Sequence, residues 1–162
     1  SMGRFFDAAA DLLNINAIQS HEAQATIKLQ QLAEEHGEVA ALAEGFRITE
    51  NNNLDFSPLL SAMIDCYDAK RDTSYAAALF HATLIAGLTT WVKEAARRHN
   101  ISQLALGGGC FHNAVLRYGL INRLATPSFH LFSAQHMQPD DSAIALGQAR
   151  VALRYNMDCI FD

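Results

Sequence analysis

The sequence predicts an α/β fold in which helices surround a parallel pair of strands. An apolar run at Ile101–Leu106 is typical of a buried strand and leads into a turn of three glycines. A helical segment at Asn113–Leu124 and a second apolar run at Phe129–Phe132 follow. Two strands joined by a crossover helix are parallel, because the helix returns the chain to the same end of the sheet.

Apolar spacing and helix boundary residues predict the remaining elements. Gly37 is expected to end the second helix, and Pro58 suits the first turn of the third. The predicted elements outside the crossover are a helix through AAADLLNI ending near Asn14–Asn16, a helix within HEAQATIKLQQLAEEHG, a short strand at Gly45–Ile48, a turn at Asn51–Asn53, and helices at Ser57–Tyr67, Ser74–His99 and Ser142–Tyr155.

The composition is that of a soluble globular domain. The chain has 162 residues, of which 50% are hydrophobic and 18% charged, and this excludes long disorder, collagen and a small disulfide-stapled scaffold. A net charge of −5 argues against a broad phosphate-binding surface, so no nucleic-acid partner is expected. The three cysteines share no CxxC spacing, which fits a reducing compartment and provides no metal framework.

One segment, Ser74–Val92, is nearly long enough to cross a membrane and has no charged side chain. It contains His81 and three threonines, and charged residues flank it, so we predict a buried helix and no membrane partner. No basic-then-apolar signal segment opens the chain, and a cytoplasmic location is expected. Ser1-Met2 is interpreted as a cloning remnant, which leaves residues 3–162 as the natural domain sequence.

The strongest local signal for chemistry is the glycine turn, Gly107–Gly109. Three residues without Cβ atoms leave N–H groups and a helix N-terminus free to point at one spot, which suits a phosphate. The turn is neither a Walker loop nor a GxGxxG motif, and close packing of strand on helix explains it equally well. In this turn, His112 is a site candidate, whereas Cys110 is predicted to be a small packing residue.

A second signal precedes the last predicted helix, where Asp140 and Asp141 are adjacent carboxylates. Either could cap the helix by accepting backbone N–H bonds, or the pair could bind a divalent cation. The seven histidines show no HxxxH or HExxH spacing, and His81 is predicted to be a satisfied core histidine. Read alone, Asp7 and Glu22 look like surface carboxylates.

Five motifs in this order resemble the C-terminal end of the HypF family, the carbamoyltransferases of nickel–iron hydrogenase maturation. They are GRFFDAAADLL, SHEAQAT, FHATLIAGL, LALGGGCFHNAVL and QPDDSAIALGQA, and together they span Gly3 to about Ala152. The resemblance implies that residues 3–162 are the C-terminal portion of a carbamoyltransferase domain. The implied fold is part of an actin-like ATPase (ribonuclease H-like) lobe, with a parallel sheet and helix-rich insertions.

The resemblance also implies an activity, small-molecule substrates and a partner. Carbamoyl phosphate is cleaved, ATP activates the carbamate as carbamoyl-adenylate, and the carbamoyl group passes to the C-terminal cysteine thiol of HypE. The expected cofactors are therefore ATP or carbamoyl-adenylate and a divalent metal ion (Zn, Fe or Mg), and the expected partner is a HypE-like maturation protein.

Residue roles follow from the same resemblance. Gly108, Gly109 and Asn113 match a GGVFQN-like motif that holds the nucleotide phosphates, although Cys110 and His112 replace its usual Val and Gln. Asp141 matches the metal-binding Asp of a PNDGG-like motif, in which Asp140, Ser142 and Ala143 are departures. The positions of Asp7 and Glu22 match acidic residues expected near the nucleoside.

The family's HxxxH metal motif, zinc finger and YrdC-like domain have no counterpart in this sequence. We therefore expect a C-terminal fragment of a longer enzyme, and we expect the isolated chain not to carbamoylate HypE. Two alternatives stay open: a non-catalytic interaction module that retains the fold, and a fragment of a tRNA-modifying or small-molecule carbamoyltransferase. The acidic balance of the chain counts against a tRNA substrate.

Overall fold

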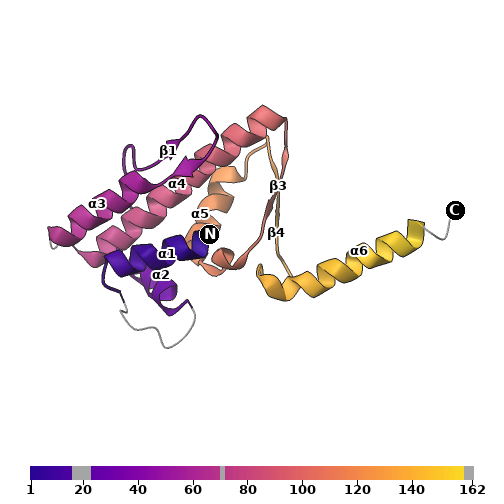
Figure 1. The fold of residues 1–162 in the computed structure, drawn as a ribbon, viewed down its shortest axis with the longest axis horizontal. Coiled ribbons are helices and arrows are strands. Elements are labelled where there is room, and N and C mark those ends of the chain that lie inside the picture. Colours follow the sequence, from indigo (N-terminus) through magenta and orange to yellow (C-terminus); the bar gives the residue numbers. More distant parts are fainter. Residues whose placement is uncertain (16–22, 70–71, 159–162) are drawn as a thin grey trace.

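The long helix α4 (Thr73–His99) is the centre of the fold, and the other helices of the body pack around it (Figure 1). The computed structural model describes residues 1–15, 23–69 and 72–158. Its other elements are α1 (Met2–Leu12), α2 (Gln24–His36), β1 (Arg47–Ile48), β2 (Leu54–Asp55), α3 (Ser57–Asp68), β3 (Gln103–Leu106), the 3-10 helix η1 (Gly109–His112), α5 (Ala114–Leu124), β4 (His130–Ser133), the 3-10 helix η2 (Asp141–Ala143) and α6 (Ile144–Asp158).

Residues at its two ends explain the length of α4. The Asp72 side chain accepts a hydrogen bond from the Ser74 N–H at 2.9 Å and so caps the N-terminus. Asn100 adopts a left-handed conformation that ends the helix, after a last turn of Arg97, Arg98 and His99 that complements the helix dipole.

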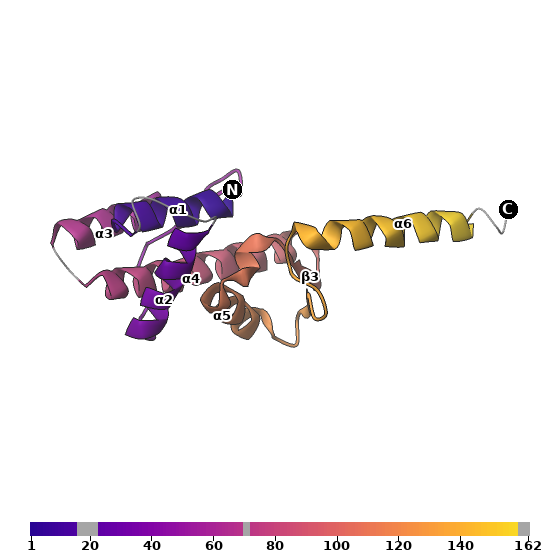
Figure 2. The ribbon, with the colours of Figure 1, turned by 90° about the horizontal axis from the view of Figure 1, so that it is seen from below.

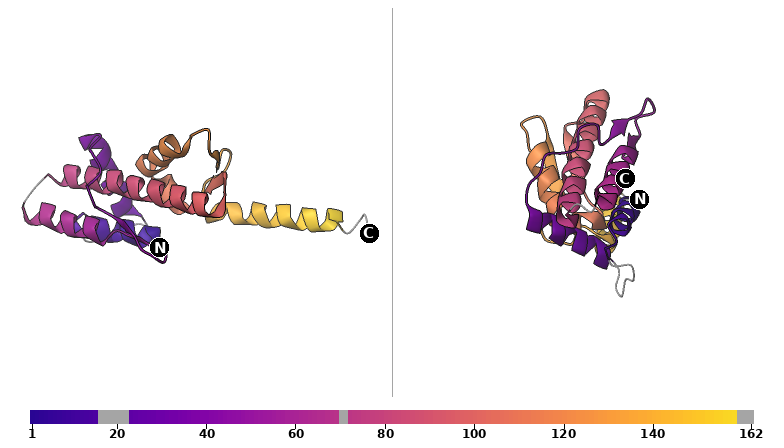
Figure 3. Two further views of the ribbon diagram at one scale, coloured as in Figure 1. Left: turned by 90° about the horizontal axis from the view of Figure 1, so that it is seen from above. Right: turned by 90° about the vertical axis from the view of Figure 1, so that its left-hand side faces the viewer.

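Helix α4 is also long and apolar enough to cross a membrane by length and composition, but 61% of its apolar window is buried inside the protein. Helices α2, α3 and α5 contact it, and Figures 2 and 3 show it running along the body with α3 and α5 beside it. The prediction of a buried core helix at Ser74–Val92 is confirmed, since many of its side chains belong to the hydrophobic core.

An aromatic cluster joins α1 to α4. Phe6 and Phe80 are fully buried, with ring centroids 5.2 Å apart and the rings edge to face. Phe5 packs against Phe80 at 5.3 Å and against Phe56 at 5.4 Å, which extends the cluster toward α3. The cluster fixes the position of α1, and therefore of the Asp7 side chain that follows Phe6.

The crossover unit has the predicted topology, but the prediction of a buried strand at Ile101–Leu106 is wrong. β3 begins at Gln103, its residues alternate between exposed and half-buried, and Ile101 is 48% exposed. Within the described residues this sheet has two strands, so little of it is covered. β3 and β4 are parallel, with Gln103 opposite His130 and Leu106 opposite Ser133, and α5 connects them on the side of α4. Helix α6 contacts η2 and projects away from the body (Figure 1).

Several boundaries differ from the sequence-based prediction, and the largest difference is in the first helix. α1 begins at Met2 rather than after Asp7, and it ends at Leu12 because Asn14 adopts a positive φ of 54°. The strand β2, which pairs antiparallel with β1, was not predicted, because its two residues are too few for an alternating pattern.

Candidate functional site

The glycine turn lies at the carboxyl end of β3 and leads into η1 and α5. Gly108 has φ 108° and ψ 151°, a conformation essentially restricted to glycine. A Cβ atom built at Gly107, Gly108 or Gly109 would meet no other atom within 4 Å. Close packing of strand on helix therefore does not explain these glycines, and the open space favours a ligand that approaches the backbone.

Backbone N–H groups of the turn are available for an anion. Gly109 and Cys110 begin η1, where the first N–H groups of a helix have no partner within that helix. The N-terminus of α5 is less available, because the Gln30 side chain accepts from the Ala114 N–H at 3.2 Å and Asn113 accepts from the Leu116 N–H at 2.9 Å. An anion would thus bind the turn and η1 rather than α5.

The Asn113 side chain is only 5% exposed and joins α5 to α4. Its Oδ1 caps α5, and its Nδ2 lies 3.0 Å from Nε2 of His81. The Nδ1 atom of His81 lies 2.8 Å from the Ala77 carbonyl oxygen, which can only accept, so Nδ1 carries the proton and Nε2 accepts from Asn113. Asn113 therefore attaches the end of the glycine turn to α4 and α5. Its predicted contact with the nucleotide phosphates stays a prediction.

His81 is a satisfied core histidine, as predicted. Burial lowers the pKa of its imidazole, against the opposing effects of the Ala77 carbonyl and the charge of Glu34. The neutral ring is consistent with an acceptor at Nε2.

This depressed pKa predicts acid sensitivity. Between the lowered pKa of the folded state and about 6.5 in the unfolded state, the unfolded chain binds more protons, so the free energy of unfolding falls as pH is lowered. We expect urea denaturation at pH 5.5 and 7.5 to show a larger loss for the wild type than for His81→Gln. If the free energy of unfolding depends equally on pH in the two proteins, His81 does not have a lowered pKa in the folded state.

The loop before α6 meets the glycine turn through two bonds. The Gly108 N–H donates to the Pro139 carbonyl oxygen, and Nε2 of His112 lies 2.7 Å from Oδ2 of Asp140. Oδ1 of Asp140 accepts from the Ser142 N–H at 2.9 Å, so Asp140 is the residue that caps η2. The bonds from Ser142 and His112 lower the pKa of Asp140 to about 2.

Asp141, the predicted metal ligand, is exposed. In the described part of the chain, its carboxylate has no hydrogen-bond or ion-pair partner, so both oxygens are available to a cation. Within residues 1–15, 23–69 and 72–158, however, no three His, Cys, Asp or Glu side chains come close enough to hold a metal ion. Asp141 thus fits the role of a single ligand, with nucleotide phosphates, water or other protein groups completing the site.

Asp7, predicted to lie near the nucleoside, is carried by α1 beside the glycine turn. Its Oδ1 accepts from the Thr26 hydroxyl at 3.5 Å. Burial, followed by the charge of Asp7, raises the pKa of the Cys110 thiol. Cys110 packs against the hydrophobic core, which agrees with its predicted packing role. Glu22, the second predicted nucleoside contact, lies outside the described residues.

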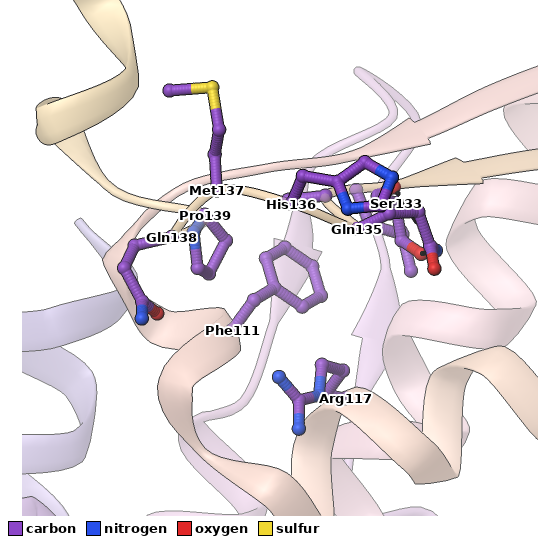
Figure 4. A pocket seen from close by; sticks show the side chains of 10 residues that line it. Phe111, Arg117, Ser133, Gln135, His136, Met137, Gln138 and Pro139 are labelled. Atoms are coloured by element: carbon purple, nitrogen blue, oxygen red, sulfur yellow. Dashed lines mark hydrogen bonds between the residues drawn. The ribbon is translucent and has the colours of Figure 1, made fainter.

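A cavity of about 390 Å³ next to the turn was not predicted. Figure 4 shows Phe111 above Arg117, with the loop from Ser133 to Pro139 on the other side. Nε of Arg117 is buried and has no hydrogen-bond partner among the described residues. Only the tertiary fold brings this loop over α5, so no local sequence signal could have revealed the cavity.

Comparison with known proteins finds relatives of one kind along nearly the whole chain. A sequence model of the family described as "Carbamoyltransferase, Kae1-like Domain, second subdomain" matches residues 1–148. The chain is 36% identical over 180 residues to carbamoyltransferase HypF2 of Cupriavidus necator. It is 35% identical over 158 residues to carbamoyltransferase HypF of Rhizobium leguminosarum bv. viciae. The alignments cover 95% and 98% of this chain but 22% and 20% of those relatives, so the chain spans about a fifth of their length.

A solved structure is also similar. Full-length HypF in the phosphate- and nucleotide-bound form matches with a TM-score of 0.83 and 29% sequence identity. The match covers 96% of this chain and 20% of that one. The similarity confirms the predicted α/β class and its assignment as part of an ATPase-like lobe.

Proposed function

Because the chain belongs to the HypF family of carbamoyltransferases, we propose that it forms the nucleotide- and metal-binding C-terminal part of such an enzyme. The activity proposed for the whole enzyme is transfer of a carbamoyl group from carbamoyl-adenylate, made from carbamoyl phosphate and ATP, to the C-terminal cysteine thiol of a HypE-like partner. In that transfer a C–S bond forms, the C–O bond to AMP breaks, and the thiol loses its proton. The product serves cyanide-ligand synthesis for a nickel–iron hydrogenase.

One observation carries the nucleotide part of this proposal: an open glycine turn is bonded to the loop that leads directly to Asp141, whose carboxylate has no partner among the described residues. The turn offers donors for phosphate oxygens, and the space beside its glycines leaves room for a ligand. The bond from Gly108 to Pro139 and the contact between His112 and Asp140 hold the two segments together. Phosphate and a divalent ion bound to it need this combination of N–H donors and a nearby carboxylate.

Each residue then has a distinct role. Gly108 shapes the turn, Asn113 anchors it, and the N–H groups of Gly109 and Cys110 donate to phosphate oxygens. Asp141 supplies one ligand to a divalent ion, which would neutralise phosphate charge when bound. Asp7 accepts a hydrogen bond from a ribose hydroxyl, and Glu22 is proposed for the same task.

The substitution Gly109→Val tests the proposal without disturbing the fold. The new Cβ atom meets no other atom within 4 Å in the free protein, so the melting temperature is expected to change little, while the affinity for ATP with Mg²⁺ falls about tenfold or more. Isothermal titration calorimetry measures both proteins. Ala125→Val, an exposed change just after the C-terminal end of α5, is the matched control and should bind like the wild type.

Two results would contradict the nucleotide proposal. One is a wild-type chain that binds no ATP, and the other is a Gly109→Val variant that binds as tightly as the wild type. In either case, the open turn has another use.

A second function, an interaction module without catalysis, is favoured by helix α6. It exposes five large hydrophobic side chains, namely Ile144, Leu146, Val151, Leu153 and Tyr155. Large apolar side chains that lie exposed along one helix mark a surface that another protein segment normally covers. An interaction module has no need to bind phosphate at the glycine turn. The ATP titration above therefore separates the two functions, since only the carbamoyltransferase part is expected to bind ATP.

A further inference from the structure

We propose that His112 is a positioning residue of the nucleotide site, which holds Asp140 and thereby keeps the backbone of the neighbouring Asp141 beside the glycine turn. This inference rests on the proposed function, because it assigns a role within the same site. It concerns two side chains, at positions 112 and 140, that have no direct role in the proposed phosphate and metal contacts.

The two oxygens of the Asp140 carboxylate accept hydrogen bonds from two different segments. Oδ1 accepts from the Ser142 N–H at 2.9 Å and shapes the first turn of η2. Oδ2 accepts from Nε2 of His112 at 2.7 Å, a short distance typical of a strong hydrogen bond to a carboxylate. A single carboxylate thus connects η1 to η2, which begins at Asp141.

A second bond makes the connection rigid. The Gly108 N–H donates to the Pro139 carbonyl oxygen, one residue before Asp140. The glycine turn and the loop are therefore joined at two neighbouring points, once through the backbone and once through side chains. Two attachments limit rotation of the loop in a way that one would not, and they hold the backbone at Asp141 close to the glycine turn.

Global stability does not explain the pair. The His112 and Asp140 side chains are 48% and 34% exposed, and exposed ion pairs add little to folding. The effect of breaking the contact should therefore be local. It should alter what Asp141 does with a metal ion, while the rest of the protein keeps its stability.

The test compares ATP affinity with and without Mg²⁺, by calorimetry, in the wild type and three variants. We expect His112→Ala to reduce the Mg²⁺-dependent gain in affinity about fivefold, with metal-free ATP affinity and melting temperature unchanged. His112→Gln should retain the gain, because its amide N–H can also donate to Asp140. His136→Ala, which removes an exposed histidine from the loop between β4 and η2, is the matched control and should behave as the wild type.

A second substitution checks the route through Asp140. In Asp140→Ser, the serine hydroxyl can still cap η2, but the side chain is too short to reach His112. This variant should therefore show the same reduced Mg²⁺-dependent gain in ATP affinity as His112→Ala. The double variant should be no worse than either single variant. Full retention of the Mg²⁺-dependent gain in His112→Ala, or additive losses in the double variant, would overturn the proposal.

Amide hydrogen exchange separates failure of this inference from failure of the proposed function. If the wild type binds no ATP, or gains nothing from Mg²⁺, the nucleotide and metal proposal fails and the exchange rate of the Ser142 N–H decides the positioning role. Faster exchange in His112→Ala, by about fivefold, and normal exchange in His112→Gln would support it. Unchanged exchange in His112→Ala would overturn it.

Discussion

Asn113→Ala is expected to lower the free energy of unfolding by about 2–4 kcal/mol, the sum of a lost helix cap and a buried acceptor left without a donor. The first loss is the bond from the Leu116 N–H to Oδ1, at 2.9 Å. The second is the bond to Nε2 of His81, whose burial leaves this nitrogen without a donor once the amide is removed. Urea denaturation at pH 7.5 measures the change.

Two further variants make this prediction specific. Asn113→Asp keeps the capping oxygen but sets a carboxylate oxygen against Nε2 of His81, so an intermediate loss is expected. Asn122→Ala changes the same residue type on the exposed side of α5 and should shift stability by less than about 0.5 kcal/mol. A loss below about 1 kcal/mol in Asn113→Ala would contradict the anchoring role.

A destabilised Asn113→Ala protein should also bind ATP more weakly, since the glycine turn would lose its anchor to α4. The comparison with Gly109→Val is informative. In Gly109→Val, the new side chain occupies the proposed phosphate site while the protein stays stable. In Asn113→Ala, the glycine turn itself loses its attachment to α4. A loss of binding in both, with a loss of stability only in Asn113→Ala, separates the two roles.

Much of the fold was predictable because local signals agreed with the tertiary structure. Between residues 101 and 133, a strand, the glycine turn, a helix and a second strand follow in the predicted order. The two strands are parallel, as predicted. Pro58 and Gly37 lie at the helix boundaries that they predicted. The antiparallel pairing of β1 with β2 was missed, because two-residue strands depend on their neighbours rather than on their own pattern.

The candidate site was predictable in its parts but not in its connections. Gly108 and Asp141 were singled out by motif, and the structure brings their segments together. The contact between His112 and Asp140 joins residues that are 28 positions apart, and no local pattern reports such a distance. The same holds for Gln30, whose side chain caps α5 from a different helix.

The double use of Asn113 illustrates why motifs understate structural roles. The motif resemblance assigns this residue to the nucleotide, yet both ends of its amide are engaged within the protein. A residue that shapes a binding turn and a residue that touches the ligand can give the same sequence signal. Burial distinguishes them, and burial follows from the tertiary fold.

Phe6→Ala should produce the largest loss of stability, about 3–5 kcal/mol, because it leaves a cavity where a fully buried ring packed. The Phe6 ring packs edge to face on Phe80, with centroids 5.2 Å apart, and its centroid lies 5.7 Å from that of the His81 ring. Its removal therefore also weakens the packing of His81, which bonds to Asn113 at the end of the glycine turn. Urea denaturation gives the change. Phe6→Leu, which fills much of the space, should lose clearly less.

The same substitution has a consequence for the site, since Phe6 holds the helix that positions Asp7. Burial and the Asp7 charge raise the pKa of the Cys110 thiol in the wild type. Loosening α1 should lower that pKa and speed alkylation of Cys110 by iodoacetamide at pH 8, read by mass spectrometry of the Cys110 peptide. Phe132→Ala, a change at an exposed ring on β4, is the control and should leave the rate unchanged. If Phe6→Leu and Phe6→Ala both alkylate at the wild-type rate while stability falls, α1 does not depend on this ring for its place beside the turn.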